Sequence, residues 1–353
     1  MYALDDYDYE LPEDLIAQMP CTQRDGSRLL HLDRGSGDIS HRLFRDLPNF
    51  LRSGDVLVIN NTKVIPGRLL GRKDTGGKAE VLLLTYSDGR ASQKTGGEFA
   101  CTCLIKSSKK PRIGSTIFFD HGLCAEVLKP TGDCYEVRFT CENDFDQVLY
   151  QVGKVPLPPY IRRNSGTGFC EDDTAYQTIY ASEKGAIAAP TAGFHFSEEL
   201  MTQLRDMGIA VAQITLHVGY GTFIPVRVSD IREHRMHSET YAVGRQAAEA
   251  INDARAGGGR IVAVGTTSVR TLEFSASEDG RVTAGAGYCN LFIYPGYRFK
   301  AVDALITNFH LPRSTLLMLV SAFAGRNIVL NAYRAAIQKG YRFYSYGDAM
   351  LIE

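Results

Sequence analysis

A long central stretch of the chain, residues 66–154, contains short strand-like runs and no run that indicates a helix. Turns rich in Gly, Pro, Asp and Ser separate these runs at close spacing, as in small antiparallel barrels and sandwiches. Of these two, we predict a barrel for residues 66–154. The expected strands are 79–84, 99–105, 116–119, 124–128 and 135–139.

The segments on either side of this stretch differ from it, because in them strands alternate with helices. A helical opening and the apolar strand 56–59 precede it, and the Pro-rich linker 155–160 follows it. Repeated strand–helix units favour a mostly parallel or mixed sheet covered by helices. We therefore predict a discontinuous α/β domain, residues 1–65 and 155–353, with a mixed sheet or barrel-like core and an inserted β-barrel domain.

Capping residues mark several helices of the second half. Thr174 opens a capping-box signal, Ser197 and Ser314 precede helical stretches, and Gly325 follows one. We expect helices at 176–181, from 198 to a stop at Gly208, from 268, at 316–323 and at 332–338, and strands at 211–216, 261–264, 304–307 and 343–345.

Composition narrows the class of protein. The formal net charge of −1 argues against non-specific coating of nucleic acid but allows a local basic patch. The eight cysteines include no Cys-x-x-Cys pair, which favours reduced thiols in the cytoplasm. The N-terminus lacks a signal-peptide stretch, and the longest apolar run, 316–320, is too short to span a bilayer. We expect a cytoplasmic monomer with no membrane segment.

Two loops place a histidine beside glycines and small hydroxyl residues. The first is residues 190–196, PTAGFHF, and contains His195; the second is residues 216–223, LHVGYGTF, and contains His217. Glycine lets a backbone approach a ligand closely, and histidine titrates near neutral pH. Because the combination occurs twice, the sequence predicts chemistry at or near these loops.

Two further motifs follow predicted strands. In residues 265–273, GTTSVRTLE, free N–H groups and hydroxyls at a helix start would bind an anion or a carboxylate. A helix cap with a buried salt bridge from Arg270 or Glu273 explains this motif equally well. In residues 308–314, NFHLPRS, Asn308 and His310 lie where open α/β sheets bind ligands. We favour a ligand-facing loop here over side chains that only tie down the loop.

Residues 233–239, EHRMHSE, hold His234 and His237 with flanking carboxylates. A zinc site is conceivable, but no cysteine lies near and the His-Glu-x-x-His pattern is absent. A proton-transfer or hydrogen-bonding pair of His237 and Glu239 is the better interpretation, and a solvated polar loop is its main competitor.

Basic residues cluster in or beside the predicted barrel, and Tyr160 lies near one cluster as an aromatic able to stack on a base. Contacts to phosphates dominate affinity for nucleic acids, and aromatic side chains bind unstacked RNA bases. Single clusters of this kind are usually solvated faces, but three together predict an RNA-facing surface. They are Arg68, Arg72 and Lys73; Lys106, Lys109, Lys110 and Arg112; and Arg162 and Arg163.

Taken together, ordered blocks over nearly the whole chain resemble one enzyme family, the S-adenosylmethionine:tRNA ribosyltransferase-isomerases of queuosine biosynthesis. Phe194 stands where we expect Leu and Gly67 where we expect Ala, changes that affect packing detail. The blocks are residues 9–12, 58–69, 155–161, 190–196, 216–226, 234–241, 264–273, 307–317 and 347–350.

The resemblance implies a reaction. The ribosyl part of S-adenosylmethionine is transferred to 7-aminomethyl-7-deazaguanine at the tRNA wobble position and isomerised, which gives epoxyqueuosine and releases adenine and methionine. No metal and no bound cofactor are implied, because S-adenosylmethionine is a co-substrate. The sulfonium acidifies the 5′ C–H, so a positioned base with a pKa near neutrality would start the reaction.

The resemblance and the motifs together give a set of candidate site residues. The catalytic candidates are His195 and His217 first, with His237, Glu239 and His310 in reserve. For S-adenosylmethionine we expect Thr191, Gly193, Phe194, Gly219, Gly221, Thr222, Thr266, Thr267, Arg270, Asn308 and His310, with the methionine carboxylate near Thr266 and Thr267. For tRNA we expect Lys63, Arg68, Lys109, Lys110, Tyr160 and Arg162.

Two other functions compete with this interpretation. One is a metal-dependent hydrolase that uses His234, His237 and Glu239. The other is a tRNA-binding or RNA-chaperone module whose glycine–histidine loops are structural. Neither explains the ordered blocks.

Overall fold

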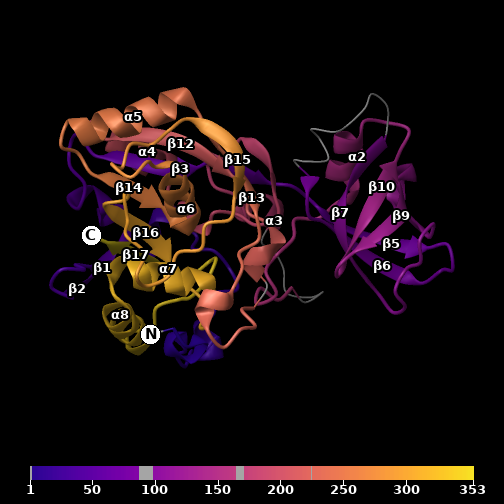
Figure 1. The fold of residues 1–353 in the computed structure, drawn as a ribbon, viewed down its shortest axis with the longest axis horizontal. Helices are drawn as coiled ribbons and strands as arrows, with labels where there is room; N and C mark the ends of the chain where they lie inside the picture. Colours follow the sequence, from indigo (N-terminus) through magenta and orange to yellow (C-terminus); the bar gives the residue numbers. More distant parts are fainter. Residues whose placement is uncertain (1, 87–97, 164–170, 224) are drawn as a thin grey trace.

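The computed structural model describes residues 2–86, 98–163, 171–223 and 225–353, without the side chains of Thr222 and Phe223. A nine-stranded mixed sheet forms the body, which holds both chain ends, and a closed barrel projects from one side of it (Figure 1). Across the sheet the strands are β15 (Gly285–Cys289), β13 (Glu239–Val243), β12 (Ala210–Leu216), β3 (Val56–Asn60), β14 (Ile261–Val264), β16 (Ala304–Asn308), β17 (Ala349–Ile352), β1 (Arg28–Leu32) and β2 (Ile39–Leu43).

The sheet is mixed, as predicted. Its central strands β12, β3, β14 and β16 run parallel to one another. The pairs β16–β17, β12–β13, β13–β15 and β1–β2 are antiparallel, and β17 is parallel to β1. Four neighbouring parallel strands therefore end at one edge of the sheet.

Helices cover both faces of this sheet, because its central strands are apolar on both sides. Val56 and Val58 belong to one core with α5 (Arg245–Ala256), α6 (Gly265–Ser275), α7 (Thr315–Ala324) and α8 (Arg326–Gln338). Leu57 and Ile59 belong to the opposite core with α4 (Glu198–Asp206). Strands buried on both faces are typical of parallel sheets.

The insert is a closed antiparallel barrel, which confirms the predicted fold class. Its strands follow the order β10-β7-β6-β5-β8-β9, and Phe99 and Phe139 pack in its core. The bounds are β5 (Arg68–Lys73), β6 (Lys78–Leu83), β7 (Glu98–Ser107), β8 (Thr116–Phe118), β9 (Cys124–Thr131) and β10 (Cys134–Thr140). Two short parallel strands, β4 (Thr62–Val64) and β11 (Glu183–Ala186), form a separate sheet.

The prediction of strands alone in the insert was wrong, because the insert also contains a 3₁₀ turn at Asp120–Gly122 and a helix. Helix α2 (Phe145–Val152) follows the last barrel strand, and Asp144 caps it by accepting a hydrogen bond from the Gln147 N–H at 3.2 Å. Phe145 stacks on Phe99 of the barrel core with ring centroids 4.3 Å apart. Strand β5, which was not predicted, closes the barrel between β6 and β8.

Local capping signals were the most accurate predictions. The Ser197 hydroxyl accepts a hydrogen bond from the Leu200 N–H at 3.1 Å, and the Ser314 hydroxyl accepts one from the Leu317 N–H at 3.2 Å. Gly325 ends α7 with a φ of 87°, a conformation that favours glycine.

Several other elements differ from the prediction, and helix α5 and strands β1, β2, β13 and β15 were not predicted. The capping-box signal at Thr174 lies inside the short helix α3 (Asp172–Ala175), and residues 176–181 form turns. The N-terminal region forms short 3₁₀ turns, and α6 begins at Gly265 rather than at 268. The last strand is β17, whereas Phe343 forms an isolated bridge with Ile16 and the turn that follows begins at Tyr344, which has a φ of 69°.

Two expectations from composition concern membranes and cysteines. Within the described ranges no single helix is long and apolar enough to cross a membrane; α7 and α8 pass such a test only as a pair bent by 112°. The described cysteines are free thiols, and Cys170 lies outside the described residues.

Candidate active site

The carboxyl ends of the parallel strands bring several sequence motifs together. Segments 217–219 and 265–267 directly follow β12 and β14, and segment 308–310 begins with the last residue of β16. These strands are neighbours in one sheet through β3. Open α/β sheets bind ligands at this edge. The motif at Asn308 was predicted to lie there, and the topology adds the others.

A pocket of about 840 Å³, which includes space open to solvent, lies at this edge. Six of the residues predicted for S-adenosylmethionine line it: Thr191, Thr266, Thr267, Arg270, Asn308 and His310. Sequence reasoning missed Tyr176, Tyr344 and Ser345, which also line it. The polar and aromatic run 344–347, YSYG, which stands just before the apolar residues 349–352, was the available signal.

His310 is the one histidine of the described residues that lines this pocket. Its Nε2 lies 2.8 Å from the Thr307 hydroxyl, and its backbone N–H donates to the Tyr333 hydroxyl at 2.9 Å. The Tyr9 hydroxyl donates to the His310 carbonyl. Burial lowers the pKa of His310 to about 3, so the imidazole is neutral at physiological pH.

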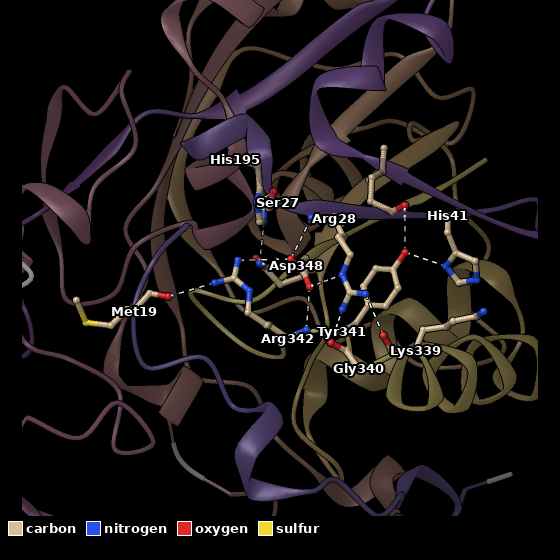
Figure 2. Close-up of polar contacts among 12 residues, drawn as sticks. Met19, Ser27, Arg28, His41, His195, Lys339, Gly340, Tyr341, Arg342 and Asp348 are labelled. Atoms are coloured by element: carbon tan, nitrogen blue, oxygen red, sulfur yellow. Dashed lines mark hydrogen bonds and ion pairs between the residues drawn. The ribbon is translucent and has the colours of Figure 1, made fainter. Parts of the chain in front are cut away.

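Asn308 connects the pocket to His195, which lies behind the pocket wall. The Thr191 hydroxyl donates to Asn308 Oδ1 at 2.8 Å, and Asn308 Nδ2 donates to His195 Nε2 at 3.1 Å. In this arrangement the proton of His195 is on Nδ1, which lies 2.7 Å from the Ser27 hydroxyl (Figure 2). Burial lowers the pKa of His195 to about 4, and Asp348 partly offsets this effect.

Asp348 fixes the turn that leads into β17. Its carboxylate accepts hydrogen bonds from the backbone N–H groups of Arg28 at 3.0 Å and Arg342 at 2.8 Å, and both guanidiniums approach it (Figure 2). The Asp348 backbone carbonyl also lies 3.5 Å from Asn308 Nδ2. The floor behind Asn308 is therefore held by a buried carboxylate that two partly exposed arginines approach.

Arg270 and Glu239 form a buried ion pair beside the pocket, with only 6% and 5% of their side chains exposed. Glu239 also accepts a hydrogen bond from the Gly219 N–H at 2.8 Å, and Arg270 Nε donates to the Leu291 carbonyl at 3.0 Å. Burial, the largest single effect, lowers the pKa of Arg270, but Glu239 and Cys289 together outweigh burial, so this pKa is raised. The buried salt bridge considered for Arg270 is present, and it ties α6 to β13 and to the loop after β12.

His217 lies in a neighbouring hollow of about 380 Å³, together with Thr85 and Tyr86 from the segment after β6. Its Nδ1 lies 2.7 Å from the Thr62 hydroxyl. His217 therefore lies where the sheet edge meets the side of the barrel, and it does not line the pocket of Asn308.

The segment 233–239 does not bring its two histidines to one centre. His234 packs edge-on against Phe292, and burial lowers its pKa. His237 lies against Gly221, where a Cβ would meet the imidazole at 2.7 Å, whereas Glu239 binds Arg270. Over the described ranges no group of three His, Cys, Asp or Glu side chains has a metal-binding arrangement. Of the five catalytic candidates, only His310 lines the main pocket, and the role of all five in catalysis stays a prediction.

The remaining predicted S-adenosylmethionine residues lie around the pocket rather than in its wall. A Cβ on Gly193 would lie 2.0 Å from the Tyr180 hydroxyl, so this glycine permits close packing. Phe194 packs edge-on against Tyr176. Gly219 donates to Glu239, and Thr222 has a side chain outside the described residues.

The residues predicted to contact tRNA have different environments. Tyr160 lines the main pocket, its hydroxyl lies 2.7 Å from that of Ser345, and burial raises its pKa to about 12. Arg68 is paired with Glu80 at 2.9 Å, and the largely exposed Arg162 lies 3.6 Å from Glu13. Lys63 is half-buried on β4, and Lys109 and Lys110 are exposed on a barrel loop.

Comparison with known proteins gives the family. The model of the family described as "Queuosine biosynthesis protein" matches residues 4–352. The chain belongs to this family. It is 54% identical over 352 residues to the S-adenosylmethionine:tRNA ribosyltransferase-isomerase of Symbiobacterium thermophilum and 51% identical over 350 residues to that of Syntrophotalea carbinolica, with 99% of each chain covered.

A solved structure supports the same assignment. The crystal structure of S-adenosylmethionine tRNA ribosyltransferase from Thermotoga maritima is 37% identical to this chain, with a TM-score of 0.54. The match covers 99% of this chain and 100% of the other. The resemblance inferred from the ordered blocks is therefore confirmed at the level of the family.

Proposed function

We propose that this protein is an S-adenosylmethionine:tRNA ribosyltransferase-isomerase. In this reaction the ribosyl moiety of S-adenosylmethionine is transferred to 7-aminomethyl-7-deazaguanine in tRNA and isomerised, with release of adenine and methionine. The main support is that the sequence is 51% and 54% identical, over 99% of its length, to two enzymes of that name. A pocket built from the ordered motifs at the carboxyl edge of the parallel strands supports it.

The main pocket is the proposed S-adenosylmethionine site. Tyr160 and Tyr176 offer aromatic walls for an adenine ring, and the backbone N–H groups at the start of α6 offer donors for the methionine carboxylate. The Thr267 hydroxyl is buried without a partner among the described residues, so it is available to a ligand. Glu239 already neutralises Arg270, so the carboxylate would rely on these N–H groups and hydroxyls.

We assign proton-transfer roles according to where each candidate side chain lies relative to the main pocket. His310 touches the pocket and is neutral at physiological pH, which suits a hydrogen-bonding partner for the leaving adenine, whereas a pKa of about 3 makes it a weak general base. His195 reaches the pocket through Asn308, and His217 lies in the adjoining hollow. His237 and Glu239 remain in reserve, since Glu239 is bound to Arg270.

The substrates and setting follow from the same proposal. The co-substrates are S-adenosylmethionine and a tRNA that carries 7-aminomethyl-7-deazaguanine in its anticodon loop, and the enzyme acts as a cytoplasmic monomer without a resident cofactor. The modified base must leave the anticodon stack to reach the pocket, which costs a few kcal/mol that contacts to the tRNA backbone offset.

The test is direct. Purified protein is incubated with S-adenosylmethionine and tRNA bearing 7-aminomethyl-7-deazaguanine, without added metal, while adenine release and nucleoside mass are followed. We expect adenine, methionine and a nucleoside with the mass of epoxyqueuosine, and no adenine with tRNA that carries guanine at that position. Failure to form the product with folded protein and verified tRNA would overturn the proposal.

A further inference from the structure

The outer surface of the barrel carries a second, more open groove that spans β8, β5, β6 and β7. It encloses about 1580 Å³, which includes space open to solvent, and it does not share residues with the main pocket. The side chains that matter for its chemistry are Leu70, Arg72, Lys78, Glu80, Lys106, Phe118 and Asp120.

Strand register explains why these side chains share one face. Arg72 lies opposite both Phe118 of β8 and Lys78 of β6. Two residues back along β5, Leu70 lies opposite Glu80, which in turn lies opposite Lys106 of β7. Because side chains alternate along a strand, their neighbours point into the barrel core and these residues point outward.

The groove exposes apolar surface that the fold does not use. Phe118 is 49% exposed and Leu70 is 48% exposed, although both are large hydrophobic residues. Gly71 shapes the floor between them, because a Cβ there would lie 2.5 Å from the Phe118 carbonyl and 2.6 Å from the Phe119 ring. An exposed aromatic beside aliphatic surface is a common feature of binding sites.

Positive charge surrounds this apolar surface. Arg72, Lys78 and Lys106 make no ion pair with any side chain in the described ranges. Arg68 binds Glu80 through two hydrogen bonds and lowers its pKa, which leaves Asp120 as the one uncompensated carboxylate of the lining. The cationic surface continues onto the exposed loop of Lys109 and Lys110.

We infer that this groove binds a strand of the substrate tRNA, with Arg72, Lys78 and Lys106 at its phosphates and Phe118 stacked on a base. The inference rests on the proposed function, which supplies an RNA as partner. Cations around an exposed aromatic platform match the way proteins hold single-stranded nucleic acid. The groove lies on the projecting barrel, so it contacts nucleotides other than the one in the main pocket (Figure 1).

The experiment measures the dissociation constant of the full-length protein for tRNA bearing 7-aminomethyl-7-deazaguanine, by fluorescence anisotropy over a range of salt concentrations. The variants are Lys78→Ala with Lys106→Ala, Phe118→Ala and Phe118→Tyr. The control replaces two exposed cations of the body, Arg245→Ala with Arg334→Ala. Circular-dichroism melting shows that each variant is folded.

We expect the double lysine variant to bind tRNA roughly 10-fold more weakly, with a salt dependence reduced by about 0.7 to 0.9 per cation. Phe118→Ala should weaken binding about 5-fold or more, whereas Phe118→Tyr keeps the ring and should bind as the wild type does. The body control should leave both quantities unchanged.

Unchanged tRNA binding in the folded groove variants would overturn the inference and leave the groove to another partner, such as an acidic protein. If the body control variant weakened tRNA binding equally, the inference would also be overturned, because the loss of affinity would then reflect the total charge of the protein rather than the groove. The adenine-release assay on wild-type protein separately decides the proposed function, so the two failures are distinguishable. Wild-type protein that binds no tRNA would overturn both.

Discussion

The side-chain amide of Asn308 donates to His195 Nε2 at 3.1 Å, while its oxygen accepts a hydrogen bond from the Thr191 hydroxyl at 2.8 Å. Both ends of the amide are thus held, and His195 holds the end that faces away from Thr191. His195 itself lines a different hollow, together with Ser27. The histidine therefore influences the pocket through the position of Asn308.

Replacing this histidine tests that relationship. We expect His195→Gln to lower kcat/KM by up to roughly 100-fold, mainly through KM for S-adenosylmethionine, because Asn308 loses its support. The pH dependence of kcat/KM should keep its shape. Asn308→Ala should give a similar loss, and the double variant little more, since both act on one unit. Loss of a limb of the pH profile in His195→Gln would instead identify the imidazole as the proton-transfer group.

Buried neutral histidines predict sensitivity to acid. The pKa values of His195 and His310 are lowered to about 4 and about 3 from an ordinary value of 6.5, so the unfolded chain takes up protons first as pH falls. Stability should therefore be lost below about pH 6.5, by about 1.4 kcal/mol per pH unit for each histidine. Urea unfolding from pH 7 to pH 4.5 measures this slope.

A matched pair of variants tests whether His195 contributes to this change of unfolding free energy with pH. His195→Gln should remove about one histidine's share, whereas His121→Asn, at an exposed turn with a φ of 55°, should leave it unchanged. Equal slopes in all three proteins would show that other groups cause the acid sensitivity.

Local features could be predicted from the sequence more completely than contacts between distant segments. Ser197, Ser314 and Gly325 were found because a cap depends on residues within one helical turn. The place of Asn308 at the carboxyl edge of the sheet followed from the alternation of strands and helices, whereas the sheet order that brings Gly265 beside it did not. By contrast, the aromatic residues 343–345 were predicted to form the last strand. The last strand is β17 instead, because its position depends on pairing with β1 and β16.

Which side chains enter the pocket depended on contacts between distant segments. Tyr160 lines the pocket because the linker folds back so that its ring lies 4.7 Å from that of Tyr344, and its contact with tRNA stays a prediction. Glu239 was paired in prediction with His237, its neighbour in sequence, whereas it binds Arg270 from another element. Neither periodicity nor residue spacing in the sequence indicates such partners, because the packing of α6 against β13 determines them.

Gly193 offers a test of close packing beneath the pocket. A Cβ at this position would meet the Tyr180 hydroxyl at 2.0 Å and the Thr178 methyl at 2.7 Å. We expect Gly193→Ala to destabilise the protein by about 1–3 kcal/mol. The Tyr180 hydroxyl is buried without a partner among the described residues, so Tyr180→Phe alone should be nearly neutral and should restore part of the loss in the double variant. Additive effects in thermal melting would contradict this steric explanation.

The buried pair of Arg270 and Glu239 predicts an asymmetric response to substitution. Glu239→Ala leaves the guanidinium buried without its counter-charge, which should lower the free energy of unfolding by about 3–5 kcal/mol. Removing both charges in Arg270→Met with Glu239→Leu should restore most of that loss, because no buried charge remains. The surface pair Lys129 and Glu136, 2.8 Å apart and 64% and 38% exposed, is the control, and Glu136→Ala should cost less than about 1 kcal/mol. Urea unfolding at pH 7 compares these three variants with the wild type. A double variant no more stable than Glu239→Ala would show that the contacts of Arg270 with the Leu291 carbonyl, rather than charge balance, hold α6 in place.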